Sequence, residues 1–181
     1  MDLRLDVENA VQITAAFAQA PEIVMEELDS AMRSIMLYLR GQTQDRTPTD
    51  QGTLREAFIE EVMPEPQFDR VVGTLTNALP YALPVELGTK PHFPPLAPLK
   101  DWAARHIEYF SDGSGDAPDV EAIARGIQRK IGRQGSPGYG MARFALLDGR
   151  ETIAAEFADA GARITARIEA QGNAGNAGGA A

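Results

Sequence analysis

The two histidines, His92 and His106, are the first residues to test for chemistry, because an imidazole can act as a general base or bind a metal. They are too far apart in sequence to form a paired ligand motif on one helix, and the chain contains no His-Glu-x-x-His sequence. His92 lies in a proline-rich stretch and His106 lies on an amphipathic segment. We therefore expect structural or surface roles for both histidines and no metal site.

Three serines, Ser111, Ser114 and Ser136, lie in glycine-rich segments that could expose a nucleophile. The chain has neither a Gly-x-Ser-x-Gly turn nor an ordered base partner, so nucleophilic catalysis has no support. The segment GRQGSPGYG (132–140) could be mistaken for a phosphate-binding loop. It lacks the Gly-Lys-Ser/Thr ending of a P-loop and does not follow a predicted strand, so we expect a loop between helices.

Adjacent acids occur as Glu26-Glu27 and Glu60-Glu61, a composition that general acid–base catalysis could use. Neighbouring residues do not face one another on a helix, and solvated faces account for both pairs. The absence of cysteine excludes a thiolate nucleophile, a disulfide framework and a Cys-ligated zinc. The sequence thus predicts a protein that is not an enzyme and has no catalytic, metal-binding or cofactor-binding residues and no cofactor.

The most patterned segment is 77–102, NALPYALPVELGTKPHFPPLAPLKDW. Its six prolines argue against an ordinary helix or a central strand, yet apolar residues recur along it, which a solvated linker would lack. These features predict a shaped loop in which Gly88 forms a turn and Pro94 and Pro95 stiffen the exit. Trp102 either anchors the loop to the following helix, which we favour, or forms part of an interface.

The order of motifs resembles that of the head-tail joining, or tail-completion, proteins of long-tailed bacteriophages. The segment TPTDQGTLREAF (47–58) is similar to the Pro-x-Asp-x-Gly-x-Leu stretch that precedes the first strands of that family. The residues that match the family's later succession are Asn77, Tyr81-Ala82, Glu86, Gly88-Thr89, Pro94-Pro95, Leu99 and Trp102. The segment AIARGIQRKIGRQG, followed by an aromatic near Phe144, is similar to the family's helix, glycine and aromatic ending.

This resemblance implies a structural virion protein of the phage neck, assembled in the host cytoplasm. It implies a homo-oligomeric ring, commonly a hexamer, that joins a head-side connector or stopper protein to the tail terminator or tail tube protein. Genome DNA would pass through the channel without specific binding. The side chains expected at interfaces are Tyr81, Glu86, Thr89, Lys90, His92 and Phe93.

Two other functions stay open. A tail terminator or another minor tail protein of related α+β build would differ only in the rings that it touches. A small host enzyme or regulatory binder is the third alternative. The net charge of −9 argues against a general phosphate-binding surface, since such surfaces need clustered Lys and Arg.

Hydrophobic periodicity predicts an α+β fold with a long N-terminal helix packed on an antiparallel sheet and additional C-terminal helices. The long helix is expected to begin at Pro21 and to extend to Thr43, with Ile23, Leu28, Met32, Ile35 and Leu39 facing the sheet. Two strands, 58–63 and 70–76, are expected to form the sheet. Further helices are expected over about 99–110, 119–131 and 141–170, with Gly149 and Gly161 able to bend or split the last one.

The length predicts one substantial domain over 21–170. An N-terminal extension (1–20) contains a possible edge strand with Leu3, Leu5 and Val7 on one face. A Gly/Ala/Asn tail (171–181) is expected to be flexible. The first residues lack the pattern of a signal peptide, and no apolar run is long enough for a membrane span, so no membrane partner is expected.

Overall fold

The computed structural model describes residues 10–110 and 118–177, and within them it gives only the backbone for 10–19, 68 and 174–177. Residue contacts divide the chain into two compact units. We call them the long-helix unit (residues 1–78 and 141–181) and the loop unit (79–140). The sequence predicted one domain over 21–170, whereas the contacts place parts of this span in two units. Whether the two units form one domain stays a prediction. The possible strand at Leu3 to Val7 lies outside the described residues.

The long-helix unit is built around α1 (Ala10–Asp45). The prediction that this helix begins at Pro21 is wrong, because Pro21 lies inside it. A proline within a helix removes one main-chain hydrogen bond, but the alanine-rich residues before it favour helix strongly enough to continue upstream. Of the five residues predicted to face the sheet, Ile23 and Ile35 are almost completely buried, as is Met36, and the other three are half-buried.

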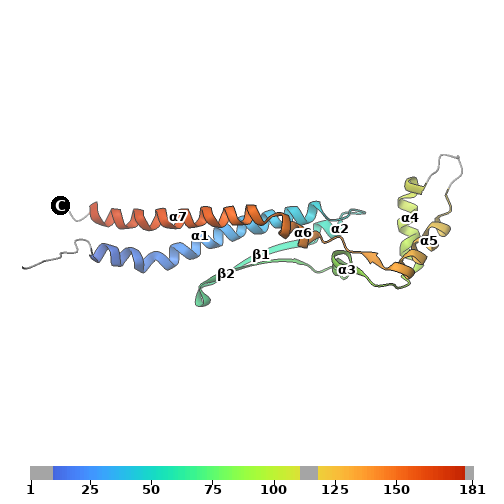
Figure 1. Ribbon diagram of the computed structural model, residues 1–181, viewed down its shortest axis with the longest axis horizontal. Coiled ribbons are helices and arrows are strands. Elements are labelled where there is room, and N and C mark those ends of the chain that lie inside the picture. The colour runs from blue at the N-terminus through green and yellow to red at the C-terminus, as the bar shows by residue number, and fades with distance from the viewer. Residues whose placement is uncertain (1–9, 111–117, 178–181) are drawn as a thin grey trace, which may run out of the picture. The chain divides into compact units, whose positions relative to one another are not determined.

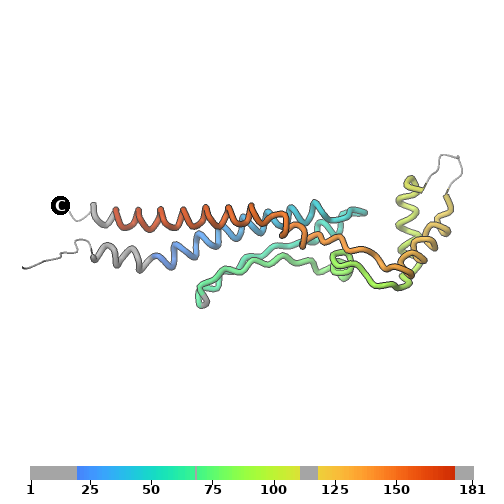
Figure 2. The backbone as a smooth tube through the Cα atoms, in the orientation of Figure 1, coloured from blue at the N-terminus to red at the C-terminus, as the bar shows by residue number. Residues whose placement is uncertain are grey.

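The hairpin that packs against α1 consists of β1 (Phe58–Glu65) and β2 (Arg70–Asn77), as predicted. The strands are antiparallel, with Phe58 opposite Asn77 and Val62 opposite Gly73, and a short 3-10 turn, η1 (Pro66–Phe68), joins them. In Figure 2 both strands run alongside α1. Gly73 allows close packing, because a Cβ there would lie 2.7 Å from the sulfur atoms of Met32 and Met36. A single helical turn, α2 (Thr53–Glu56), precedes the hairpin.

The C-terminal part of this unit forms α6 (Met141–Asp148) and α7 (Arg150–Ala177). The predicted single helix is therefore split at Gly149, whereas Gly161 leaves α7 continuous. Gly149 is buried, and a Cβ there would lie 2.8 Å from the ring of Tyr38 on α1. Figure 1 shows α7 lying beside α1 along most of its length. Residues 171–177 of the expected flexible tail continue α7, and residues 178–181 lie outside the described part, so the flexibility of the tail stays a prediction.

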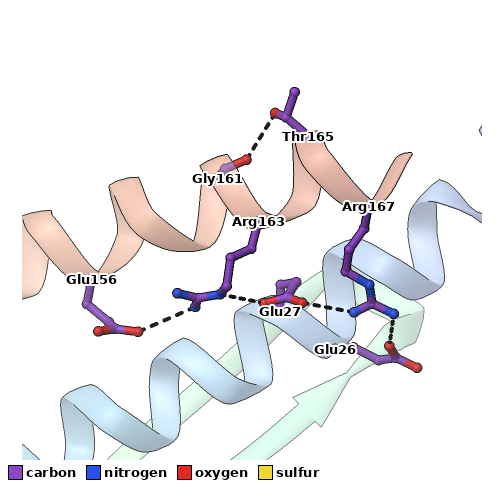
Figure 3. Close-up of polar contacts among 7 residues, drawn as sticks. All are labelled: Glu26, Glu27, Glu156, Gly161, Arg163, Thr165 and Arg167. Atoms are coloured by element: carbon purple, nitrogen blue, oxygen red, sulfur yellow. Dashed lines mark hydrogen bonds and ion pairs between the residues drawn. The ribbon is translucent and has the colours of Figure 1, made fainter. Parts of the chain in front are cut away.

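Ion pairs join α1 and α7 (Figure 3). Arg163 donates to Glu27 at 2.8 Å, and Arg167 donates to Glu27 at 2.9 Å and to Glu26 at 2.7 Å. The Arg163 guanidinium, and next the Arg167 guanidinium, hold the pKa of Glu27 below its ordinary value of 4.5. Glu26 and Glu27 thus connect two helices, which explains this pair better than the solvated face that the sequence suggested.

The loop unit has short elements. Its helices are α3 (Ala82–Leu87), α4 (Leu96–Arg105) and α5 (Val120–Gln134), with a 3-10 turn, η2 (Ile107–Phe110), after α4. Two-residue strands, β3 (Gly88–Thr89) and β4 (Ser136–Pro137), pair antiparallel. α4 packs against α5 (Figure 1). The Asp119 carboxylate caps α5 by accepting hydrogen bonds from the N–H groups of Glu121 and Ala122.

The predicted α+β class is confirmed: a long helix packs on a small antiparallel sheet, and further helices follow. The prediction that no helix forms inside the proline-rich segment is wrong, because α3 contains Pro84. Pro84 occupies the first turn, where main-chain N–H groups have no helical acceptor, so a proline costs little there. No helix in the described residues is long and apolar enough to cross a membrane.

Candidate docking site

All of the residues predicted for interfaces or loop structure belong to the loop unit. The chain leaves α3 at Gly88, passes through β3, and reaches α4 across the proline-rich stretch 90–95. Prolines fix φ along this path, and Pro95 occupies the N-cap position of α4. The predicted stiff exit from the loop therefore corresponds to a defined connection between two helices.

The pairing of β3 with β4 depends on glycine, and we call Gly88, Gly135 and Gly138 the glycine clasp. Gly88 has φ 80° and ψ 178°, and Gly135 has φ 73° and ψ −161°, a region that is essentially restricted to glycine. A Cβ at Gly135 would overlap the Thr89 carbonyl oxygen, and one at Gly138 would lie 2.5 Å from the Leu87 carbonyl carbon. The clasp therefore brings two backbones into direct contact.

Hydrogen bonds complete the clasp. The hydroxyls of Thr89 and Ser136 are 2.7 Å apart, and the Ser136 N–H donates to Thr89 Oγ1 at 3.1 Å. The N–H groups of Tyr139 and Gly140 donate to the carbonyls of Val85 and Glu86 at 2.9 and 3.0 Å. The segment 132–140 is thus more than the loop between helices that the sequence predicted, because part of it pairs with the proline-rich segment.

The six predicted interface side chains differ in exposure. Phe93 is 71% exposed and Tyr81 is 43% exposed, while Lys90 and His92 also lie at the surface. Glu86 and Thr89 are half-buried, and the Thr89 hydroxyl is already bonded within the loop unit. Four of the six therefore lie where a partner could reach them, and Thr89 supports the clasp.

The Phe93 ring lies against α5. A Cβ at Gly132 would be 2.6 Å from ring atoms of Phe93, so the absence of a side chain there lets the ring pack directly on the helix backbone. Hydrogen bonds to main-chain carbonyls hold the neighbouring residues: the side-chain Nε2 of Gln128 donates to the Pro94 carbonyl at 2.8 Å, and the His92 N–H donates to the Ile131 carbonyl at 3.4 Å. Phe93 is therefore exposed on a supported backbone.

Trp102 lies half-buried on α4. Its ring stacks on His106 at a centroid distance of 4.6 Å and meets Phe110 edge-on at 6.2 Å. His106 Nδ1 lies 3.0 Å from the Trp102 carbonyl, which makes His106 part of the helix end. The Trp102 ring thus contacts the end of α4 and η2. Its anchoring of the loop stays a prediction.

Other exposed apolar residues of the loop unit were not predicted from the sequence, and three of them lie near β3 and β4. Leu83 and Leu87 are 65% and 69% exposed and lie one turn apart on α3, and Tyr139 is 55% exposed just after β4. Their spacing of four residues was a usable signal, but the expectation of a non-helical segment concealed it. Together with Tyr81 and Phe93, they make the loop unit rich in exposed apolar side chains.

The loop unit carries no net charge. Of the 17 Lys and Arg and 26 Asp and Glu residues in the sequence, seven of each kind fall within 79–140, so the net charge of −9 belongs to the long-helix unit. Lys100, and next Arg125, hold the pKa of Glu121 below its ordinary value through ion pairs. In the described ranges, no three His, Cys, Asp or Glu residues are grouped so that they could hold a metal ion. The observed arrangement suits contact with another surface.

No protein-family model matches the chain, and no significant match occurs among curated proteins or among solved structures.

Proposed function

We propose that this chain is a structural protein of the phage neck that forms a ring between the head-side connector and the tail, and that it is not an enzyme. The observation that carries this proposal is the loop unit, which holds exposed apolar side chains on a backbone fixed by the glycine clasp. It also holds most of the motifs that resemble the head-tail joining proteins. In this proposal the protein acts in the virion after assembly in the host cytoplasm.

The physical argument concerns the cost of docking. A loop that is ordered before contact loses less conformational entropy on binding than a flexible one. The clasp and the bonds around Phe93 provide such order through the main chain, while Phe93, Leu83 and Leu87 remain exposed. Large apolar side chains at a fixed position are typical anchors of protein–protein interfaces.

Charge supports the same proposal. An excess of acidic residues in the long-helix unit would repel DNA wherever that unit faces a channel, so a genome could pass without adhering. A ring of identical subunits would add these charges together. We therefore expect a channel lined by neutral and acidic residues.

Complementation of a deletion in the phage or prophage that encodes the chain tests the function. Phe93→Ala removes an exposed ring without removing a main-chain contact, so we expect a folded monomer together with filled heads and separate tails in electron micrographs. Tyr109→Ala is the matched control, because Tyr109 is equally exposed at 71% in the loop unit but lies on η2. We expect Tyr109→Ala to yield joined particles.

Two results would contradict the proposal. If heads and tails join normally in the deletion strain, the proposed function is wrong. If heads and tails join normally with Phe93→Ala, and circular dichroism shows a folded protein, Phe93 is not part of the interface.

A further inference from the structure

One helix of the loop unit bears a concentrated positive surface. Arg129, Lys130 and Arg133 are exposed around Gly126 on α5, where they line an open hollow. Nothing lies within 4 Å of the place where a Cβ of Gly126 would be, so the hollow is open at that point. In the described ranges 10–110 and 118–177, no ion pair joins any of these three cations to an acid. We call Arg129, Lys130 and Arg133 the basic ridge.

An apolar group lies beside this ridge. Phe93 rests on Gly132, which is one turn after Arg129 and directly before Arg133 on α5. Its ring is 71% exposed. The basic ridge and Phe93 therefore form a mixed cationic and aromatic surface.

The long-helix unit carries a surface of complementary character. Alternation along β1 places Phe58, Glu60 and Val62 toward α1, as the burial of Phe58 and the Arg40–Glu60 ion pair at 2.6 Å indicate. The opposite face of β1 therefore carries Ile59, Glu61 and Met63. Ile59 is 64% exposed, Met63 is 44% exposed, and Glu61 lies between them at the surface. We call Ile59, Glu61 and Met63 the outer face of β1.

Unpaired charge around the hairpin has one sign. Among the described residues, Glu56, Glu61 and Asp69 have no ion pair, whereas the cations Arg55 and Arg70 are paired with Asp45 and Glu65. The hairpin thus presents a negative surface to any partner. The basic ridge presents the opposite sign.

We propose that the basic ridge and Phe93 of one copy dock on the outer face of β1 of a second copy. In this contact the ridge faces Glu61, and Phe93 packs on Ile59 and Met63. The proposal rests on the proposed ring, because a head-to-tail ring needs two different surfaces on every subunit and this chain carries both. It also offsets the repulsion between identical chains that each have a net charge of −9.

Cross-linking between separately labelled copies tests this contact directly. The chain has no native cysteine, so Glu61→Cys and Arg129→Cys each introduce a single thiol. The two variants are mixed and treated with a short bismaleimide, and a denaturing gel then reports a covalent dimer that joins different copies. We expect this dimer from the mixture of Glu61→Cys with Arg129→Cys. We expect none from the control mixture of Asp159→Cys, an exposed position on α7, with Arg129→Cys.

Charge reversal measures the electrostatic part of the contact. Arg129→Glu with Arg133→Glu places like charges opposite Glu61, so we expect self-association to weaken at least about tenfold in sedimentation experiments at low salt. Adding Glu61→Lys should restore most of that affinity. Arg150→Glu with Arg143→Glu is the control with the same change in net charge, outside the loop unit, and should have a smaller effect.

The outcomes separate this inference from the proposed function. Self-association without the specific cross-link, or without rescue by Glu61→Lys, overturns the docking contact and leaves the ring proposal standing. Absence of self-association in assembled particles and in concentrated solution overturns both. Fluorescence anisotropy with a short DNA duplex provides the remaining arm: if the ridge variants lose DNA binding and retain self-association, the ridge binds phosphate and our proposal is wrong.

Discussion

The two units of this protein are stabilised in different ways. The long-helix unit buries side chains at helical spacing, such as Ile23, Ile35 and Met36, and connects its two long helices by arginine–glutamate pairs. The loop unit instead brings backbone against backbone at Gly135 and Gly138. The first arrangement tolerates changes on its surface, and the second tolerates almost no added atom at the clasp. The difference suggests a scaffold in one unit and a fixed contact surface in the other.

The largest effect should come from Gly135→Ala. Its backbone conformation is essentially restricted to glycine, and the added Cβ would overlap the Thr89 carbonyl oxygen, so we expect the loop unit to lose about 3 kcal/mol or more. Hydrogen exchange should report faster exchange at Tyr139 and Gly140 and unchanged exchange in β1 and β2. Gly126→Ala is the control, because a Cβ there meets nothing, and it should stabilise α5 by about 0.5–1 kcal/mol. Unchanged exchange in Gly135→Ala would contradict the role of the clasp.

Ile35→Ala should produce the reverse pattern. Ile35 is 5% exposed between α1 and its neighbours, and removing such a side chain typically costs about 2–5 kcal/mol. Denaturant unfolding should show this loss, and because Ile35 lines a pocket with Thr152 and Ile153 of α7, exchange should increase in α1 and α7 rather than at the clasp. Leu37→Ala is the control on the same helix, since Leu37 is 60% exposed and should change stability by about 0.5 kcal/mol or less. A similar cost for both variants would mean that the assigned buried face is wrong.

The smallest effect should be the part of the pH dependence that comes from the ion pairs of the long-helix unit. The pKa of Glu27 is lowered from 4.5 by Arg163 and Arg167, and the pKa of Glu60 is lowered by Arg40. A lowered pKa in the folded state gives stability that is present above pH 4.5 and is lost as the pH falls through the folded value. Glu27→Gln should therefore lower the thermal midpoint slightly at pH 7 and make the acid-induced decline shallower.

The matched variant for this measurement is Glu169→Gln, at an exposed position on the same helix as Arg163 and Arg167. As the pH falls below 5, the thermal midpoint of this variant should decline as it does in the unmodified protein. If Glu27→Gln and Glu169→Gln behaved alike, the ion pairs between α1 and α7 would contribute nothing measurable.

The sequence predicted the periodic part of the fold well. Apolar spacing located the centre of α1, and runs of β-branched and aromatic residues bounded by prolines located β1 and β2, because both patterns are local. The start of α1 was missed because Pro21 is a good first residue of a helix as well as a tolerable interior one. The contact between α1 and α7 was missed because Glu27 and Arg163 are far apart in sequence, and no local pattern connects them.

The candidate site was predicted only in part. Phe93 and Tyr81 are exposed as expected, while the Thr89 side chain supports the clasp. The pairing of Thr89 with Ser136 has no periodic signal, because each strand is only two residues long. Gly135 and Gly138 are present in the sequence, but the reason that only glycine fits there is the backbone of residues 86–90, which lies against them in the folded chain.

Cryo-electron microscopy of the neck in purified particles is the most direct test of the account. We predict a closed symmetric ring of this chain between the head vertex and the tail, in which Phe93 and the basic ridge of one copy contact the next copy. Its channel should be lined by neutral and acidic residues. Finding no density for the chain at the neck, a single copy in place of a ring, or a channel lined mainly by arginine would contradict the account.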